Sequence, residues 1–112
     1  MFIEEMFYLE NGTYVNGVFN VSYIMLKSYR NKPGQYISIS LFDKTGFIES
    51  LIWDCDSYCF DNIELDKLIE IKGKIRVFNQ KNQIIIKSFC QYYERLGNNK
   101  INNKKLKFLL RN

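Results

Sequence analysis

Apolar and polar residues alternate along much of the middle of the chain, a pattern typical of β-strands with one buried face. The pattern predicts strands over residues 13–29, 36–43, 47–54, 67–78 and 84–93. Gly17, inside the first of them, predicts a bulge or a sharp bend. The acidic segment 55–66 interrupts the alternation, and we expect a short helix or a turn there.

Turn residues occupy the joins between these strands. Residues 30–35 contain the only proline and a glycine, and predict a loop. The sequence DKTG (43–46) fits a type I turn followed by Gly46 in the left-handed conformation, a three-residue hairpin link. The polar run 79–83 predicts a second turn. One hairpin is therefore expected before the acidic segment and another after it.

The order of these elements indicates a fold class. Five strands with a short helix between strands 3 and 4 is the order of an OB-fold, a five-stranded Greek-key barrel of the all-β class. The predicted inward residues are branched enough to fill a barrel of this size. They are Ile37, Ile39, Leu41, Ile48, Ser50, Ile52, Ile69, Ile71, Gly73, Ile75, Val77, Ile84 and Ile86. We expect residues 1–94 to form this domain and residues 95–112 to form a basic tail or linker.

The outer face of strands 2 and 3 is the predicted ligand surface, because the loops joining strands 1–2 and 4–5 flank it in an OB-fold. If Ile48 and Ile52 face the interior, alternation turns Trp53 outward. Exposed rings suit the stacking of unpaired bases, and basic side chains beside them suit phosphates. The candidate nucleic-acid-binding residues are Tyr36, Ser38, Ser40, Phe47, Glu49 and Trp53 on the face, and Arg30, Lys32, Lys74, Arg76 and Lys81 around it.

The same residues allow other interpretations. Trp53 ends its strand just before the predicted helix, so that helix, Tyr58 or the first dozen residues could cover it. Glu49 lies in the middle of the surface and repels phosphate, although a carboxylate can accept hydrogen bonds from a base edge. The basic row on strand 67–78 equally fits an ordinary solvated strand face.

Charge and composition narrow the function. The net charge is +4, but residues 95–112 contribute +6, and the rest of the chain holds ten basic against twelve acidic side chains. Any electrostatic attraction for nucleic acid must therefore come from local basic patches or from the tail, residues 95–112. The chain has no histidine, which removes the commonest general base and the commonest metal ligand. We expect no metal site and no cofactor, and we expect the three cysteines to be reduced thiols that fill space.

The N-terminus and the length of the apolar runs bear on location. The first eleven residues carry three acids and no lysine or arginine, unlike a secretory signal. No apolar run approaches the roughly 18–20 residues of a membrane span. We therefore expect a cytoplasmic protein without a membrane partner.

Two runs, KPGQYISISLFDKTGFIESLIWD and DKLIEIKGKIRVFNQKNQIIIKSF, carry a family resemblance. They resemble the N-terminal OB-fold domain of the YhaM-type HD-domain 3′–5′ exoribonucleases and, more broadly, OB-fold nucleic-acid-binding modules. The resemblance spans about residues 9–90, and the motif positions are Asp43, Lys44, Thr45, Gly46, Trp53, Asp54, Gly73, Phe78 and Gln83. Those enzymes continue into a catalytic domain with a metal site of His and Asp, which this sequence lacks. The resemblance thus implies a binding module that is not an enzyme by itself.

Two functions are expected from these patterns. The first is binding of single-stranded RNA or DNA, either alone or as the substrate-binding part of a nuclease. The alternative is a protein-interaction or oligomerisation subunit, a homo-oligomer included, whose aromatic face is covered by a partner.

Overall fold

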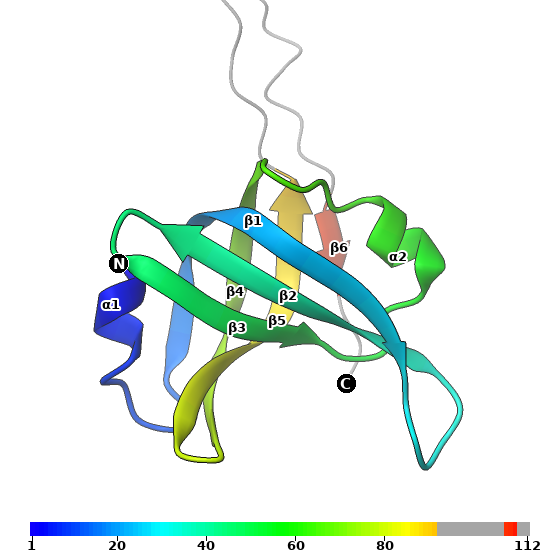
Figure 1. Ribbon diagram of the computed structural model, residues 1–112, viewed down its shortest axis with the longest axis horizontal. Helices are drawn as coiled ribbons and strands as arrows, with labels where there is room; N and C mark the ends of the chain where they lie inside the picture. The colour runs from blue at the N-terminus through cyan, green and yellow to red at the C-terminus, as the bar shows by residue number, and fades with distance from the viewer. Residues whose placement is uncertain (92–106, 110–112) are drawn as a thin grey trace, which may run out of the picture.

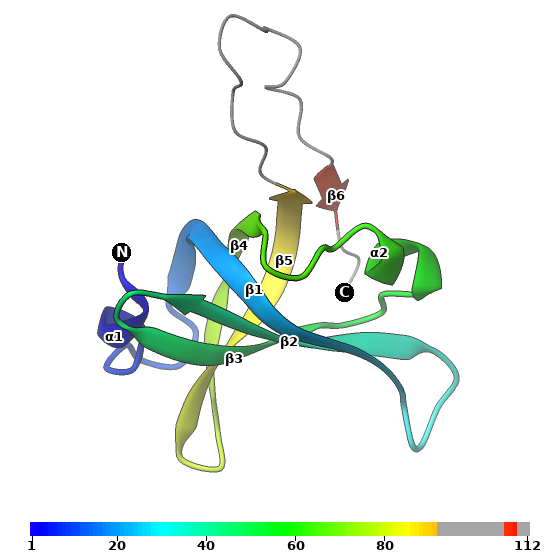
Figure 2. The same ribbon diagram turned by 45° about the horizontal axis from the view of Figure 1, so that its top comes forward.

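The strands form one sheet that closes into a barrel with a short helix at each end (Figure 1, Figure 2). The computed structural model describes residues 1–91 and 107–109. The elements are α1 (Ile3–Met6), β1 (Tyr14–Ser28), β2 (Gln35–Asp43), β3 (Gly46–Ile52), α2 (Ser57–Asp61), β4 (Leu68–Phe78), β5 (Lys81–Gln91) and β6 (Lys107–Leu109). The predicted boundary at residue 94 and most of the predicted tail lie outside the described residues.

The strand order β3-β2-β1-β4-β5-β6, with an additional β3–β5 pairing, confirms the predicted OB-fold barrel. The long strand β1 pairs with β4 through its first half and with β2 through its second half. The parallel β3–β5 pairing closes the barrel at Ser50↔Ile84 and Leu51↔Ile85. At Gly73 of β4 an added Cβ would lie 2.4 Å from the Ile85 carbonyl oxygen, so only glycine allows this close approach.

The bend in β1 does not lie where the sequence predicted it. The register shifts between Val21 and Tyr23, whereas Gly17 is paired regularly with Ile71 of β4. An added Cβ at Gly17 would lie 2.7 Å from the ring of Phe19, which is buried in the core. Gly17 is therefore small because the Phe19 ring occupies the space beside it.

The predicted inward residues lie in the core with one exception, and Ser40, which was predicted to face outward, is buried as well. The inward residues of β2 and β3 and those of β4 as far as Ile75 are buried, but Val77 is 46% exposed. Val77 lies beyond the barrel wall, where the β4–β5 hairpin projects (Figure 1). The first helix, α1, adds Ile3 and Met6 to the core. A helix of four residues is too short to show a hydrophobic periodicity, so the sequence did not predict this contribution.

Both hairpins are tighter than the sequence predicted. Asp43 pairs directly with Gly46, so the β2–β3 link has two residues, and the predicted three-residue link is wrong. Gly46 has φ +154°, which is not the left-handed helical conformation. The β4–β5 link consists of Asn79 and Gln80, with φ of +50° and +65°, as in a type I′ turn. Strand β5 consequently begins at Lys81, three residues earlier than predicted.

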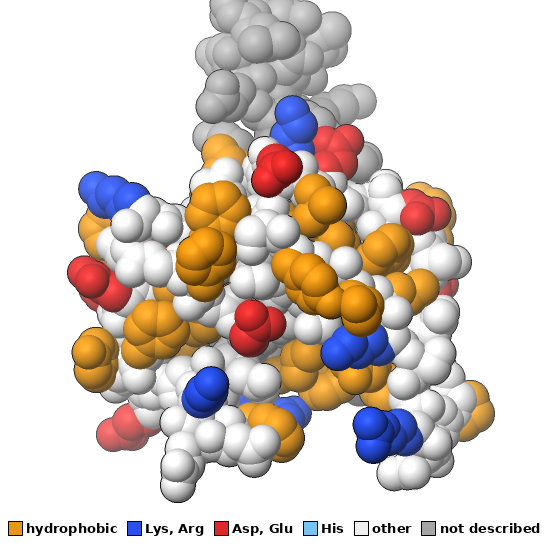
Figure 3. All heavy atoms as spheres, viewed as in Figure 1, with side chains coloured by type: hydrophobic (Ala, Val, Ile, Leu, Met, Phe, Trp, Pro, Cys, Tyr) orange, Lys and Arg blue, Asp and Glu red, His pale blue; other side chains and the backbone are white. Residues whose placement is uncertain are grey.

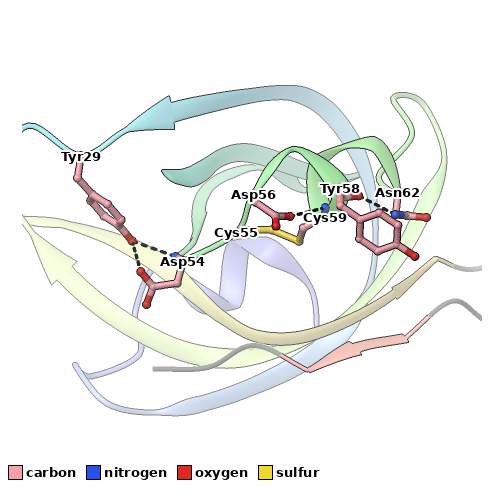
Figure 4. The surroundings of a disulfide bond; sticks show 7 residues. All are labelled: Tyr29, Asp54, Cys55, Asp56, Tyr58, Cys59 and Asn62. Carbon is pink, nitrogen blue, oxygen red and sulfur yellow. Dashed lines mark hydrogen bonds between the residues drawn. A yellow bond between two sulfur atoms is a disulfide. The ribbon is translucent and has the colours of Figure 1, made fainter. Parts of the chain in front are cut away.

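Cys55 and Cys59 form a disulfide between the end of the β3–α2 link and α2 (Figure 4). The expectation of reduced thiols is wrong for this pair, while Cys90 is a free thiol. The Asp56 carboxylate caps α2 by accepting a hydrogen bond from the Cys59 backbone at 3.1 Å. A five-residue helix is too short to be stable alone, so the cap and the cross-link hold it in place.

Among the described helices, none combines the length and the apolar character that a membrane crossing requires.

Candidate nucleic-acid interface

Three aromatic rings gather where β1, β2 and β3 meet. The centroid of Tyr36 lies 5.2 Å from that of Tyr29 and 5.2 Å from that of Trp53, and the Tyr29 and Trp53 centroids are 6.1 Å apart. Tyr36 and Trp53 point away from the buried residues Ile37 and Ile52 that neighbour them in sequence. We call Tyr29, Tyr36 and Trp53 the aromatic cluster.

Tyr29 was not among the predicted site residues, because no face was assigned to the residues of the predicted strand 13–29. In the structure Tyr29 directly follows β1, which ends at Ser28. Its hydroxyl accepts a hydrogen bond from the Asp54 backbone at 2.9 Å and donates one to the Asp54 carboxylate at 2.9 Å (Figure 4). Burial raises the pKa of the Tyr29 phenol, and the carboxylate of Asp54 raises it further. The phenol therefore stays protonated, and it fixes the turn that carries Trp53.

Two cations bracket the aromatic cluster. The Lys32 ammonium lies 4.4 Å from the Tyr29 ring centroid. The Arg76 guanidinium lies 5.6 Å from the Trp53 centroid and 4.5 Å from that of Phe78. Trp53 is consequently half-buried among its ring neighbours and Arg76, not an open platform.

The other predicted cations are spread around the face. Lys74 lies over Tyr14, 4.8 Å from its ring centroid, and is thus drawn toward β1. Arg30 is exposed in the β1–β2 loop. Lys81 lies at the start of β5, beside the β4–β5 turn. In Figure 3 basic side chains follow the lower edge of this face, where the β1–β2 loop and the β4–β5 hairpin project.

The second half of the face, toward the β2–β3 turn, presents an open ring and an acid. Phe47 is 61% exposed and stacks on Phe42, its partner in the register, at 5.4 Å between centroids. Glu49 is exposed opposite Ser40. Ser40 itself is only 7% exposed, and its carbonyl accepts a hydrogen bond from the Ser22 hydroxyl. Of the two predicted serines, only Ser38 reaches the surface in part.

The helix α1 is fastened beside this second half by two hydrogen bonds that its backbone donates to the β2–β3 hairpin. The Asp43 carboxylate accepts from the Ile3 backbone at 2.9 Å, and the Thr45 hydroxyl accepts from the Glu4 backbone at 3.0 Å. Desolvation raises the pKa of the Asp43 carboxyl, but hydrogen bonds from the Thr45 side chain and from backbone N–H groups outweigh it and lower the pKa overall.

Acid should weaken this attachment. A carboxyl whose pKa is lower in the folded protein contributes stability above its unfolded pKa of about 3.9, and loses it as pH falls through the folded value. We expect Asp43→Asn to lower the free energy of unfolding by about 1 kcal/mol near pH 6. The difference from the unchanged protein should shrink below about pH 4. Urea unfolding between pH 6 and pH 2.5 measures this.

The exposed Asp61 of α2 supplies the control for that experiment. Asp61→Asn should change stability little at either end of the pH range. A deficit of Asp43→Asn that stayed constant down to pH 2.5 would show that the charge of Asp43 does not hold α1.

Comparison with known proteins agrees with the barrel, which defines an OB-fold domain. The tRNA anti-codon family, described as an OB-fold nucleic acid binding domain, matches residues 18–89. The chain belongs to this family and is a nucleic-acid-binding OB-fold module. No curated protein sequence matches.

One similar solved structure is a murine DNA-binding protein bound with double-stranded DNA. The identity is 23% and the TM-score 0.60, over 76% of this chain and 42% of that one. The chain therefore spans less than half the length of that protein, and the likeness concerns the fold. Helix α1 lies before the segment that the family matches.

Proposed function

We propose that this domain binds single-stranded RNA or DNA across β2 and β3 and has no catalytic activity of its own. The observation that carries the proposal is the aromatic cluster with Lys32 and Arg76 against its rings. Each stacked base contributes about 1–3 kcal/mol by alanine substitution, and cations beside the rings pair with phosphates. Bases paired in a duplex do not offer their flat faces to side chains on a sheet, so unpaired bases are the ligand.

Arg76 can contribute both to the stacking surface and to phosphate binding. Its guanidinium is planar, stacks on rings and forms bidentate hydrogen bonds with phosphate. When a strand binds, the guanidinium can turn to a phosphate while its aliphatic stem keeps covering Trp53. Glu49, without an ionic partner among the described residues, repels phosphate from the middle of the face. The strand is thus oriented with its bases toward the sheet and its backbone toward Lys32 and Arg76.

The resemblance to YhaM-type exoribonucleases supports a finer proposal. The domain, over residues 1–94, would present a single strand to a nuclease domain in the same chain or in a partner protein of the cytoplasm. The six cations of residues 95–112 would then add sequence-independent attraction for the phosphate backbone.

A second candidate function is protein contact, including self-association. Phe2, Phe7 and Tyr8 are exposed around α1, and Tyr8 is 88% exposed. Aromatic residues are enriched in the centres of protein interfaces. These rings come from residues before the family match, so they are separable from the aromatic cluster.

Titration with short oligonucleotides tests both candidates. Oligo-dT and oligo-rU of about twelve nucleotides should quench the fluorescence of Trp53, the only tryptophan. With two to three phosphates neutralised, the logarithm of the association constant should fall with the logarithm of salt concentration with a slope of about −2. No binding at low salt by fluorescence or anisotropy, together with a dimer in size-exclusion chromatography, would reject the first candidate and favour the second.

A further inference from the structure

A pocket of about 380 Å³ lies at the end of the face away from the aromatic cluster. It is lined by Phe7, Phe47, Ile48, Glu49, Gln80, Lys81 and Asn82. Three elements contribute: the residue after α1, the middle of β3 and the β4–β5 hairpin. The volume falls within the range of about 300–1,000 Å³ that is usual for small-molecule sites. In Figure 3 an isolated acidic side chain lies near the middle of this face, with apolar side chains around it.

Phe7 forms one wall of the pocket, and hydrogen bonds from β5 hold the chain on either side of it. The side-chain amide of Asn82 donates hydrogen bonds to the carbonyls of Met6 and Leu9, at 2.8 and 2.9 Å. These two carbonyls flank Phe7 in sequence, and Met6 is fully buried. A Cβ added to Gly46 would lie 3.8 Å from the Phe7 ring, so this ring lies against the start of β3. Phe7 and Phe47 thus supply two phenyl rings to one pocket.

The charged groups of the pocket are the Glu49 carboxylate, which accepts hydrogen bonds, and the Lys81 ammonium, which donates them; the other polar side chains are the amides of Gln80 and Asn82. Within the described part of the chain, neither the Glu49 carboxylate nor the Lys81 ammonium has an ionic partner. The Asn82 amide nitrogen is already occupied by the two carbonyls. A ligand that fits must therefore have a flat apolar body, a pair of donors for the carboxylate and an acceptor for the ammonium.

We propose that this pocket takes one guanine base of the bound strand. The proposal rests on the proposed single-strand binding and adds a specificity to it. Guanine presents two adjacent donors, N1–H and the N2 amino group, to the two oxygens of Glu49, and its O6 accepts from Lys81. Phe7 and Phe47 contact the base, whose faces suit aromatic side chains.

The other bases match this set of groups less well. Adenine and cytosine each place a ring-nitrogen lone pair beside their amino group, and this lone pair faces a carboxylate oxygen unfavourably. Uracil and thymine offer a single N–H between two carbonyl oxygens. A base that fills the pocket displaces water from these groups, so a carboxylate oxygen left without a donor loses hydrogen bonds that the wrong base does not replace.

The test compares oligonucleotides that differ in one base. Fluorescence anisotropy with labelled dT12, and with dT12 in which a single G, A, C or inosine replaces one thymine at successive positions, gives the affinities. We expect a single G at the best position to increase affinity about tenfold over dT12, and A or C to increase it by less than twofold. Inosine lacks the N2 amino group and should recover only part of the increase.

Variants identify the groups responsible. Glu49→Gln should abolish the preference for G, and it should raise dT12 affinity because it removes the charge that repels phosphate. Lys81→Ala should reduce the preference in part. Phe7→Ala should weaken binding of the G oligonucleotide more than binding of dT12. The exposed Glu64 supplies the matched control, and Glu64→Gln should change neither affinity. Circular dichroism establishes that each variant is folded.

The outcomes separate this proposal from the one on which it rests. If dT12 itself does not bind, single-strand binding by the face fails. If dT12 binds but G adds nothing, or if the preference survives Glu49→Gln, the guanine pocket is rejected and single-strand binding stands. A preference for C that depends on Glu49 would also overturn the assignment to guanine.

Discussion

Trp53→Ala is expected to weaken the binding of single-stranded oligonucleotides by about 5- to 150-fold, which corresponds to the roughly 1–3 kcal/mol of one stacked base. The indole is the largest ring of the aromatic cluster, with Tyr36 on one side and Arg76 over it. Its removal takes away a stacking surface and releases the guanidinium that we expect to meet a phosphate. Anisotropy of a labelled dT12 measures the loss, since the variant has no tryptophan signal.

Two further variants show whether this loss is specific. Trp53→Phe keeps a ring and should retain most of the affinity, whereas Tyr58→Ala removes an exposed ring on α2, outside the face of β2 and β3. Tyr58→Ala should change affinity by less than twofold. Equal losses for Trp53→Ala and Tyr58→Ala would contradict a binding site at the aromatic cluster and would point to a diffuse effect.

Phe19→Ala is expected to lower the free energy of unfolding by about 3–5 kcal/mol, the usual cost of truncating a buried phenylalanine. The ring is among the largest fully buried side chains, and it lies against Gly17 of the same strand. Because a small domain has only about 5–15 kcal/mol in total, the variant should unfold at a markedly lower urea concentration. Trp53 fluorescence or circular dichroism follows the transition.

The neighbouring Val18, which is partly exposed on the opposite side of β1, is the control. Val18→Ala should cost less than about 1 kcal/mol. If Phe19→Ala also cost less than 1 kcal/mol, the ring would not be the central packing element that its burial indicates.

Strict alternation made the barrel and its two faces predictable. The inward positions of residues 36–43 and 47–54 are branched apolar side chains except at Ser50, and a one-residue slip would expose all of them to water. The orientation of Tyr36, Phe47 and Glu49 follows from this alone. The alternation predicts less well at the strand ends. Val77 is exposed because it lies in the projecting β4–β5 hairpin, and β5 begins at Lys81, before the predicted start of that strand.

The parts that the sequence did not predict depend on contacts between distant segments. Tyr29 reaches the aromatic cluster only because β1 and β2 pair up to Ser28↔Gln35, just before it. Phe7 forms a wall of the pocket because Asn82, seventy-three residues from Leu9, binds the chain on either side of it. The Cys55–Cys59 cross-link follows from the position of α2 at the barrel end, and four-residue spacing alone does not distinguish it from two thiols.

The closing line of the barrel has a consequence for how the domain responds to its ligand. Strands β3 and β5 are joined at only two paired positions, and the Ser50 hydroxyl there is buried without a hydrogen-bond partner in the described part of the chain. The free energy of local opening of the barrel is expected to be lowest at this short β3–β5 pairing. A nucleic acid that contacts β3 and the β4–β5 hairpin together would bridge this join. We therefore expect the β3–β5 pairing to open transiently in the free domain and to stay closed in the complex.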